Sequence, residues 1–264
     1  MEDTNTIITN QETDTASSNT VTIDAGNDKV EVTLDNVNIK ADSGSALTSK
    51  GDVTLTLKGD NHLTGGISDT GNYGRNGIAS TGSLTITGGE NGSLTAQGGS
   101  GADGGHGGHG IYSNGSLTIS GGSTVTANGG NGGNVSGDGI SSNGSVTISG
   151  GTVTANGGDG SSGGDGIRSG DIDLSGSLEL TAKAGSPNGK ALSQNGKELD
   201  LDTINKDKLD PGAKVTAINA NGDSKQVSIP ALWSRKSLLS PRSLLPLLTA
   251  ALPPRPHPPL PSPA

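Results

Sequence analysis

Apolar residues alternate with Thr and Ser along much of the chain, in short runs. Leu117 to Ile119 (LTI) and Val125 to Ala127 (VTA) are two of these runs. Alternation with a period of two places every second side chain on one face of a β-strand. Asn-Gly or Gly-Gly closes each run, and these dipeptides favour tight turns because both residue types tolerate positive φ. The pattern therefore predicts short strands, each with one buried face, and no long helices.

One phrase of this pattern occurs three times in succession. It reads GIASTGSLTITGGENGSLTAQGG from Gly77, GIYSNGSLTISGGSTVTANGG from Gly110 and GISSNGSVTISGGTVTANGG from Gly139. Diverged copies begin at Leu47 and Gly166, so the period is roughly 30 residues, which indicates a repeat architecture. Each copy predicts three short strands.

Stacking the copies would place identical residues over one another, for example Ile111 over Ile140 over Ile167. Such like-on-like stacking favours an all-β fold, a single-stranded right-handed parallel β-helix with three short strands per coil. Asn-Gly between strands is also a hairpin signal, so an array of hairpins is an alternative. A sandwich or a propeller is a further alternative, although propeller blades normally have longer strands and more aromatic residues.

The pattern divides the chain into four segments. We expect a disordered leader over 1–20, the parallel β-helix over 21–201, a capping hairpin over 202–230 and a Pro/Leu/Ser-rich disordered tail over 231–264. The cap is predicted because an uncovered terminal coil is an unpaired edge. Two other interpretations of the tail remain open: a wall-spanning or membrane-proximal anchor, and translation out of the native frame.

Composition and charge narrow the class of protein. The 264 residues include 46 Gly, no Cys and no Phe, and 28% are hydrophobic, which also suits a disordered chain. The regular spacing of the apolar residues argues against disorder. A formal charge of −9 argues against nucleic acid as a partner, and the leader contains no membrane span. We expect an extracellular or cell-surface protein, either a monomer or a fragment of a larger surface protein.

A column of polar residues precedes each Gly-Ile. Its members, Asn76, His109, Asp138 and Asp165, would lie about one strand spacing (~4.8 Å) apart. Two carboxylates this close repel unless a proton or a cation lies between them, and Ca²⁺ prefers oxygen ligands. We expect Asp138 and Asp165 to share a Ca²⁺ ion, with Asp159 as an additional ligand. The alternative is that Asp only favours these turns.

Other side chains offer binding chemistry. Tyr112 and Arg168 are expected at corresponding outward positions with Ser141 between them, and Tyr73 lies in a long loop. His106 and His109 are either a transition-metal site or two solvated histidines. Outward threonines form two columns, which either stabilise the sheet or make a flat face that binds ice or another ordered surface. These columns are Thr54, Thr85, Thr118, Thr147 and Thr95, Thr126, Thr154.

The phrases VEVTLDNVNI, GDVTLTLKG and GDGISSNGSVTISGGTVTANGG resemble those of calcium-binding β-helix carbohydrate-binding surface proteins of anaerobic bacteria. The resemblance implies a pectate-lyase-like fold and a secreted or cell-surface, adhesin-like protein that binds polysaccharide and is stabilised by calcium. By position it carries the family's turn Asp onto Asp138 and Asp165, whereas Asn76 and His109 depart from the pattern. A polysaccharide lyase is the enzymatic alternative, but no nucleophile with its base is visible, which favours a binder.

Overall fold

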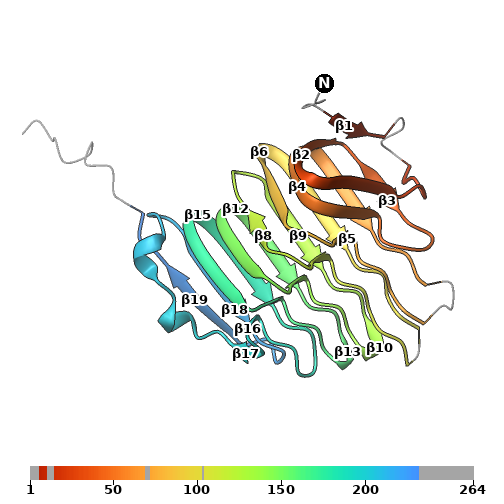
Figure 1. The fold of residues 1–264 in the computed structure, drawn as a ribbon. Helices are drawn as coiled ribbons and strands as arrows, with labels where there is room; N and C mark the ends of the chain where they lie inside the picture. The colour runs from red at the N-terminus through yellow and green to blue at the C-terminus, as the bar shows by residue number, and fades with distance from the viewer. Residues whose placement is uncertain (1–5, 11–14, 69–71, 103, 232–264) are drawn as a thin grey trace, which may run out of the picture. The chain divides into compact units, whose positions relative to one another are not determined.

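The structure is a computed structural model that describes residues 6–10, 15–68, 72–102 and 104–231, all within one compact unit, Met1–Ala231 (Figure 1). This part of the chain is all-β, as predicted: its only helices are two short 3-10 turns, η1 (Leu201–Thr203) and η2 (Lys206–Lys208). None of the helices described is long and apolar enough to cross a membrane. The predicted tail over 231–264 lies outside the described residues, apart from Ala231.

Equivalent strands of successive repeats pair side by side, parallel and in register (Figure 1). In the first row, Ile111 pairs with Ile78 on one side and with Ile140 on the other. Ile140 in turn pairs with Ile167, so the like-on-like stacking predicted from the repeats is confirmed. The row contains the start of β4 (Leu47–Thr64), then β5 (Ile78–Ser80), β7 (Ile111–Ser113), β11 (Ile140–Ser142), β14 (Ile167–Ser169) and β16 (Leu192–Gln194).

Two further rows follow the same rule. Leu117 pairs with Leu84 and Val146 in the second row, and Val125 pairs with Leu94 and Val153 in the third. Both threonine columns are in register, and Thr181 and Thr216 extend the second one. The strands are β8 (Leu117–Ile119), β9 (Thr124–Asn128), β3 (Asn38–Lys40) and the longer β2 (Val21–Asp35), β6 (Leu84–Gln97), β12 (Ser145–Asn156) and β15 (Asp171–Lys183).

The inward side chains of the three rows form one continuous apolar core. Ile111, Leu117 and Val125, one from each row, are completely buried. Because the core is narrow, Ile, Leu, Val and Ala fill it without aromatic side chains. This explains how a chain so poor in large hydrophobic residues folds.

A buried serine closes the first corner of three successive repeats by bonding to the repeat before it. The hydroxyl groups of Ser113 and Ser142 donate to the backbone carbonyls of Gly82 (2.9 Å) and Gly115 (2.8 Å), which lie in the turn of the preceding repeat. Ser169 does the same to Gly144 (2.8 Å). A buried polar group needs such a partner, so the repeated Ser of the phrases IYSNGS and ISSNGS joins each repeat to its neighbour.

The first described strand corrects one expectation. Residues 1–20 were predicted to be a disordered leader, but β1 (Thr6–Thr9) pairs in parallel with Val32 to Asp35 of β2, and Ser17 forms a bridge with Ile39. Ile8 packs against the core. Two adjacent isoleucines in a polar segment are a weak signal, and the exposed edge of β2 provides the backbone partners that order them.

Antiparallel strand pairs end the rows of parallel strands on the C-terminal side. β18 (Lys214–Ile218) pairs in parallel with β15, and β19 (Ser224–Ser228) folds back on β18 as a hairpin within the segment 202–230, where a capping hairpin is expected. β17 (Lys197–Glu198) folds back on β16. The Glu198 carboxylate accepts hydrogen bonds from the N–H groups of Ala191 and Leu192 (3.1 Å each). In earlier repeats the N–H groups at the equivalent positions donate to backbone carbonyls of the next repeat.

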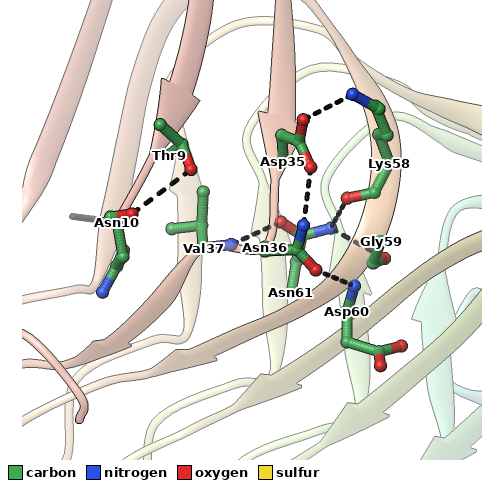
Figure 2. Close-up of polar contacts among 9 residues, drawn as sticks. All are labelled: Thr9, Asn10, Asp35, Asn36, Val37, Lys58, Gly59, Asp60 and Asn61. Atoms are coloured by element: carbon green, nitrogen blue, oxygen red, sulfur yellow. Dashed lines mark hydrogen bonds and ion pairs between the residues drawn. The ribbon is translucent and has the colours of Figure 1, made fainter. Parts of the chain in front are cut away.

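One buried asparagine replaces an apolar residue in the third row. Asn61 is fully buried in β4 and pairs with Leu94 of the next repeat. Its side-chain oxygen accepts the N–H of Val37 (2.9 Å), and its amide group donates to the carbonyls of Lys58 (3.1 Å), Gly59 (3.3 Å) and Ser93 (3.0 Å), mostly within the view of Figure 2. Asn61 therefore joins three successive repeats.

We expect Asn61→Leu to lower the free energy of unfolding, although Leu94 occupies the equivalent position. The substitution leaves the buried N–H of Val37 without a partner, which costs about 1–3 kcal/mol. Urea unfolding measures the change. His62→Thr is the matched control, because His62 is exposed and Thr95 is its partner in the next repeat. Equal stability of Asn61→Leu and the unmodified protein would contradict this role.

Candidate functional site

The polar residues before each Gly-Ile form a hydrogen-bonded column, which we call the turn ladder (Asn76, His109, Asp138 and Asp165). Each side chain accepts a hydrogen bond from the backbone N–H of the corresponding residue in the next repeat. The bonds run from His109 N to Asn76 Oδ1 (2.8 Å), Asp138 N to His109 Nδ1 (2.9 Å), Asp165 N to Asp138 Oδ1 (2.8 Å) and Lys190 N to Asp165 Oδ1 (2.7 Å). The expected column is present.

The glycine after each ladder residue allows this close approach. A Cβ atom on Gly110 would lie 2.6 Å from the backbone nitrogen of Asn128 and 2.7 Å from the carbonyl oxygen of Gly139. Only glycine fits without moving the backbone. The Gly-Ile dipeptide therefore sets the position of the turn ladder, and the ladder residue itself is free to vary.

Asp138 is the most enclosed member of the turn ladder. Its side chain is 7% exposed, and its Oδ2 atom lies 2.7 Å from Nε of Arg168. Nη2 of Arg168 donates to the hydroxyl of Ser141 (3.2 Å). The Arg168 side chain is still 51% exposed. Asp138 and Ser141 thus hold a guanidinium group in one place while leaving part of it open to solvent.

His109 is held as a neutral imidazole. Its Nδ1 atom accepts the Asp138 N–H, so the ring proton is assigned to Nε2. Nδ1 also lies 3.4 Å from Asp138 Oδ2, but an unprotonated nitrogen makes no ion pair there. Burial lowers the pKa of His109, the Asp138 carboxylate opposes this shift, and the Arg168 guanidinium adds to it.

Tyr112 covers His109 from the same repeat. The two rings stack with centroids 5.7 Å apart and an interplanar angle of 19°. Tyr112 pairs with Ser141, and Ser141 pairs with Arg168, so the three residues share one column as expected, although Ser141 is buried. The Tyr112 hydroxyl accepts a hydrogen bond from Asn143 of the next repeat (3.0 Å).

Glycine-rich loops form a second wall beside the turn ladder. Tyr73 bridges to His106, and His106 bridges to Val135 of β10 (Gly132–Val135), which pairs with β13 (Gly160–Ser162). The rings of Tyr73 and His106 are 5.3 Å apart, and both Tyr73 and Val135 are strongly exposed. We call Tyr73, His106 and Val135 the loop wall; it presents aromatic and apolar edges to solvent.

A groove of about 360 Å³ lies between the turn ladder and the loop wall. A larger hollow of about 490 Å³ near Ile8 and Ile39 has no charged side chain in its lining. The groove is lined mainly by charged, hydroxyl and amide groups, with Val135 as its apolar side chain, and such a lining suits a hydrophilic ligand. Its lining comprises His106, Gly107, His109, Val135, Ser136, Asp138, Ser162, Gly163, Asp165, Arg168, Asn188 and Lys190.

The six predicted site residues are distributed unevenly. Asp138, Asp165 and Arg168 line the groove. Tyr112 and Tyr73 do not line the groove, but their rings contact those of His109 and His106, which do. Asp159 lies apart, with its Oδ1 atom accepting the N–H of Ser186 (2.7 Å). Arg75, which lies close to Tyr73 in the sequence, is not among the lining residues.

The contacts of Asp138 do not fit a calcium site. Oδ1 accepts the Asp165 N–H, whereas the buried Oδ2 accepts no hydrogen bond from the described residues and lies 2.7 Å from Nε of Arg168, whose positive charge disfavours a cation at this oxygen. In the described ranges no group of three or more His, Asp or Glu side chains is placed to hold a metal. None of these contacts tests the calcium site predicted at Asp138, Asp165 and Asp159, but the bonds of Asp138 to the Asp165 N–H and to Arg168 favour a turn ladder that holds together without a metal.

Sequence reasoning missed two features of the groove. Lys190 lies in the groove because its N–H donates to the last residue of the turn ladder, but Ala191-Leu192 replaces the Gly-Ile pair that marks the earlier repeats. The Asp138–Arg168 ion pair joins adjacent repeats across two different columns. A one-dimensional alignment of the copies places residues within a column and does not show contacts between columns.

Comparisons of the chain with family models, with curated proteins and with solved structures give no match.

We expect the turn ladder to be independent of metal. Asp138→Ala should lower the melting temperature, because it leaves the Asp165 N–H without its acceptor and Arg168 without its counter-ion. Calcium and chelators should leave the melting temperature of the unmodified protein unchanged. Differential scanning calorimetry with and without each reagent measures both. A rise with calcium that chelator reverses would restore the calcium prediction.

The lowered pKa of His109 predicts a specific pH dependence of stability. The unfolded chain binds a proton near the ordinary histidine pKa of about 6.5, and the folded chain binds it only at lower pH, so stability falls as pH drops below about 6.5. His109→Asn keeps an acceptor, as at Asn76, and should weaken this dependence. Urea midpoints between pH 5 and 8 measure the difference. Parallel pH curves for the two proteins would exclude His109 as its source.

Proposed function

We propose that this chain is a polysaccharide-binding module of a secreted or cell-surface protein, and that its repeats form a right-handed parallel β-helix. Parallel, in-register pairing of equivalent strands supports this fold. Parallel strands that follow one another in the chain are connected almost always with a right-handed crossover. Each repeat buries its apolar side only against its neighbours, which is typical of such arrays.

The groove is the observation that carries the functional proposal. Its lining comes from four successive segments, around His109, Asp138, Asp165 and Lys190, so it crosses the repeats. A linear polymer lying in it would meet hydrogen-bonding groups at each repeat. His106 and Val135 of the loop wall line the groove and offer a ring and an apolar edge to the C–H faces of sugar rings, while Arg168, Ser136 and Asn188 offer polar groups to their hydroxyls.

The contacts favour binding over catalysis. A lyase needs a base placed beside the substrate, but His109 Nδ1 accepts a backbone N–H, and Asp138 is occupied by an N–H and by Arg168. Arg168 is itself paired, and Arg75 is outside the groove lining. The polysaccharide lyase remains the alternative function, and ice binding by the threonine columns is the second.

Affinity electrophoresis against a panel of plant and host polysaccharides tests the proposal. At least one polymer should retard the protein, and Arg168→Lys should weaken that binding about tenfold, because a lysine cannot pair with Asp138 and present a planar fork at once. Arg75→Lys is the matched control, since Arg75 is exposed and does not line the groove. Retardation unaffected by Arg168→Lys would place binding elsewhere.

The same samples separate the alternatives. Appearance of an unsaturated product absorbing in the ultraviolet would establish a lyase. Thermal hysteresis in a freezing solution would establish ice binding. Failure of every polysaccharide in the panel to bind would reject the module proposed here.

A further inference from the structure

The charges lining the groove balance one another. Arg168 and Lys190 supply two cations, and Asp138 and Asp165 supply two carboxylates. His109 adds no charge because its Nδ1 atom accepts a backbone N–H. A polyanionic ligand would therefore find no net positive charge in the groove.

The arginine in particular is already compensated. Asp138 Oδ2 lies 2.7 Å from Arg168 Nε, and the Asp138 side chain is nearly buried. The two charges attract at this distance, because the carboxylate is shielded from water even though half of the Arg168 side chain is exposed. A ligand carboxylate would have to approach Arg168 within a few ångströms of the Asp138 carboxylate, and like charges at that range repel.

The second cation has acidic neighbours. Lys190 follows the turn ladder at Asp165, and Glu198 is close to both residues. Burial raises the pKa of Glu198, the Asp165 carboxylate raises it further, and Lys190 lowers it. The positive charge of Lys190 is therefore near two carboxylates, those of Asp165 and Glu198, at this end of the groove.

The charge of the whole chain acts in the same direction. The formal net charge is −9, and residues 232–264 contain basic residues and no acidic ones, so the remainder is more acidic still. A protein field of this sign slows the approach of an anionic polymer. A polymer of uncharged sugars experiences no such repulsion and can use the same donors and acceptors.

We infer that the groove selects an uncharged polysaccharide and rejects polyanionic ones, and that the Asp138–Arg168 pair sets this preference. The inference rests on the proposed polysaccharide-binding function and names its ligand class. Arg168 acts as a fixed hydrogen-bond donor to sugar hydroxyls. Asp138 holds the guanidinium in place and cancels its charge.

Asp138→Asn tests this role without breaking the turn ladder. Asn76 occupies the equivalent position two repeats earlier, and its side-chain oxygen accepts the His109 N–H at 2.8 Å. An asparagine at 138 should accept the Asp165 N–H in the same way. The variant therefore keeps the fold and leaves the charge of Arg168 uncompensated.

The experiment uses two pairs of polymers that share a backbone and differ in charge. They are fully methyl-esterified polygalacturonate with polygalacturonate, and hydroxyethyl cellulose with carboxymethyl cellulose. The unmodified protein should bind the uncharged member of at least one pair about tenfold more tightly than the charged member. Asp138→Asn should bind the charged member more tightly than the unmodified protein does, and added salt should weaken this new binding.

Asp52→Asn is the matched control, because Asp52 is exposed, lies outside the groove and gives the same change in net charge. Equal or tighter binding of the charged members by the unmodified protein would overturn the inference and leave the binding function intact. An equal gain for Asp52→Asn, or none for a folded Asp138→Asn, would overturn the role of the ion pair. Absence of binding to every polymer, here and in the wider panel, would instead reject the binding function.

Discussion

The structure depends on the backbone hydrogen bonds between successive repeats. A repeat of short strands has no partner within itself for most of its N–H and C=O groups, and its apolar side is too small to form a core alone. Parallel, in-register pairing satisfies both needs at once: it pairs the backbone and places Ile on Ile and Leu on Leu. The corners are the difficult places, because regular pairing stops there.

Side chains take over the pairing at the corners. Serines join the first corner to the preceding repeat, Asn61 joins three repeats near the start, and the turn ladder joins the repeats at the glycine-rich side. The groove lies at this last corner, where polar side chains are needed for structural reasons. Structure and candidate function therefore share Asp138 and His109, which join the repeats and also line the groove.

Much of this arrangement could be predicted from the sequence because the period fixes which residues share a column. Ile111, Ile140 and Ile167, the threonine columns and the turn ladder all follow from aligning the copies. Contacts between columns do not follow, since they depend on how far a long side chain such as Arg168 reaches. The first strand was also missed: β1 contains no copy of the repeated phrase and is ordered only by its pairing with the edge of β2.

The bonds of the turn ladder all have the same direction, from a backbone N–H of one repeat to a side chain of the repeat before it. Each side chain of the turn ladder therefore needs only a backbone N–H from the next repeat and does not constrain the side chain at the same position of that repeat. Asparagine, histidine and aspartate already serve as acceptors in this one chain. These three residue types can therefore replace one another at each position of the turn ladder during evolution, and whole repeats can be added or removed. Either change alters the chemistry along the groove while the scaffold stays the same.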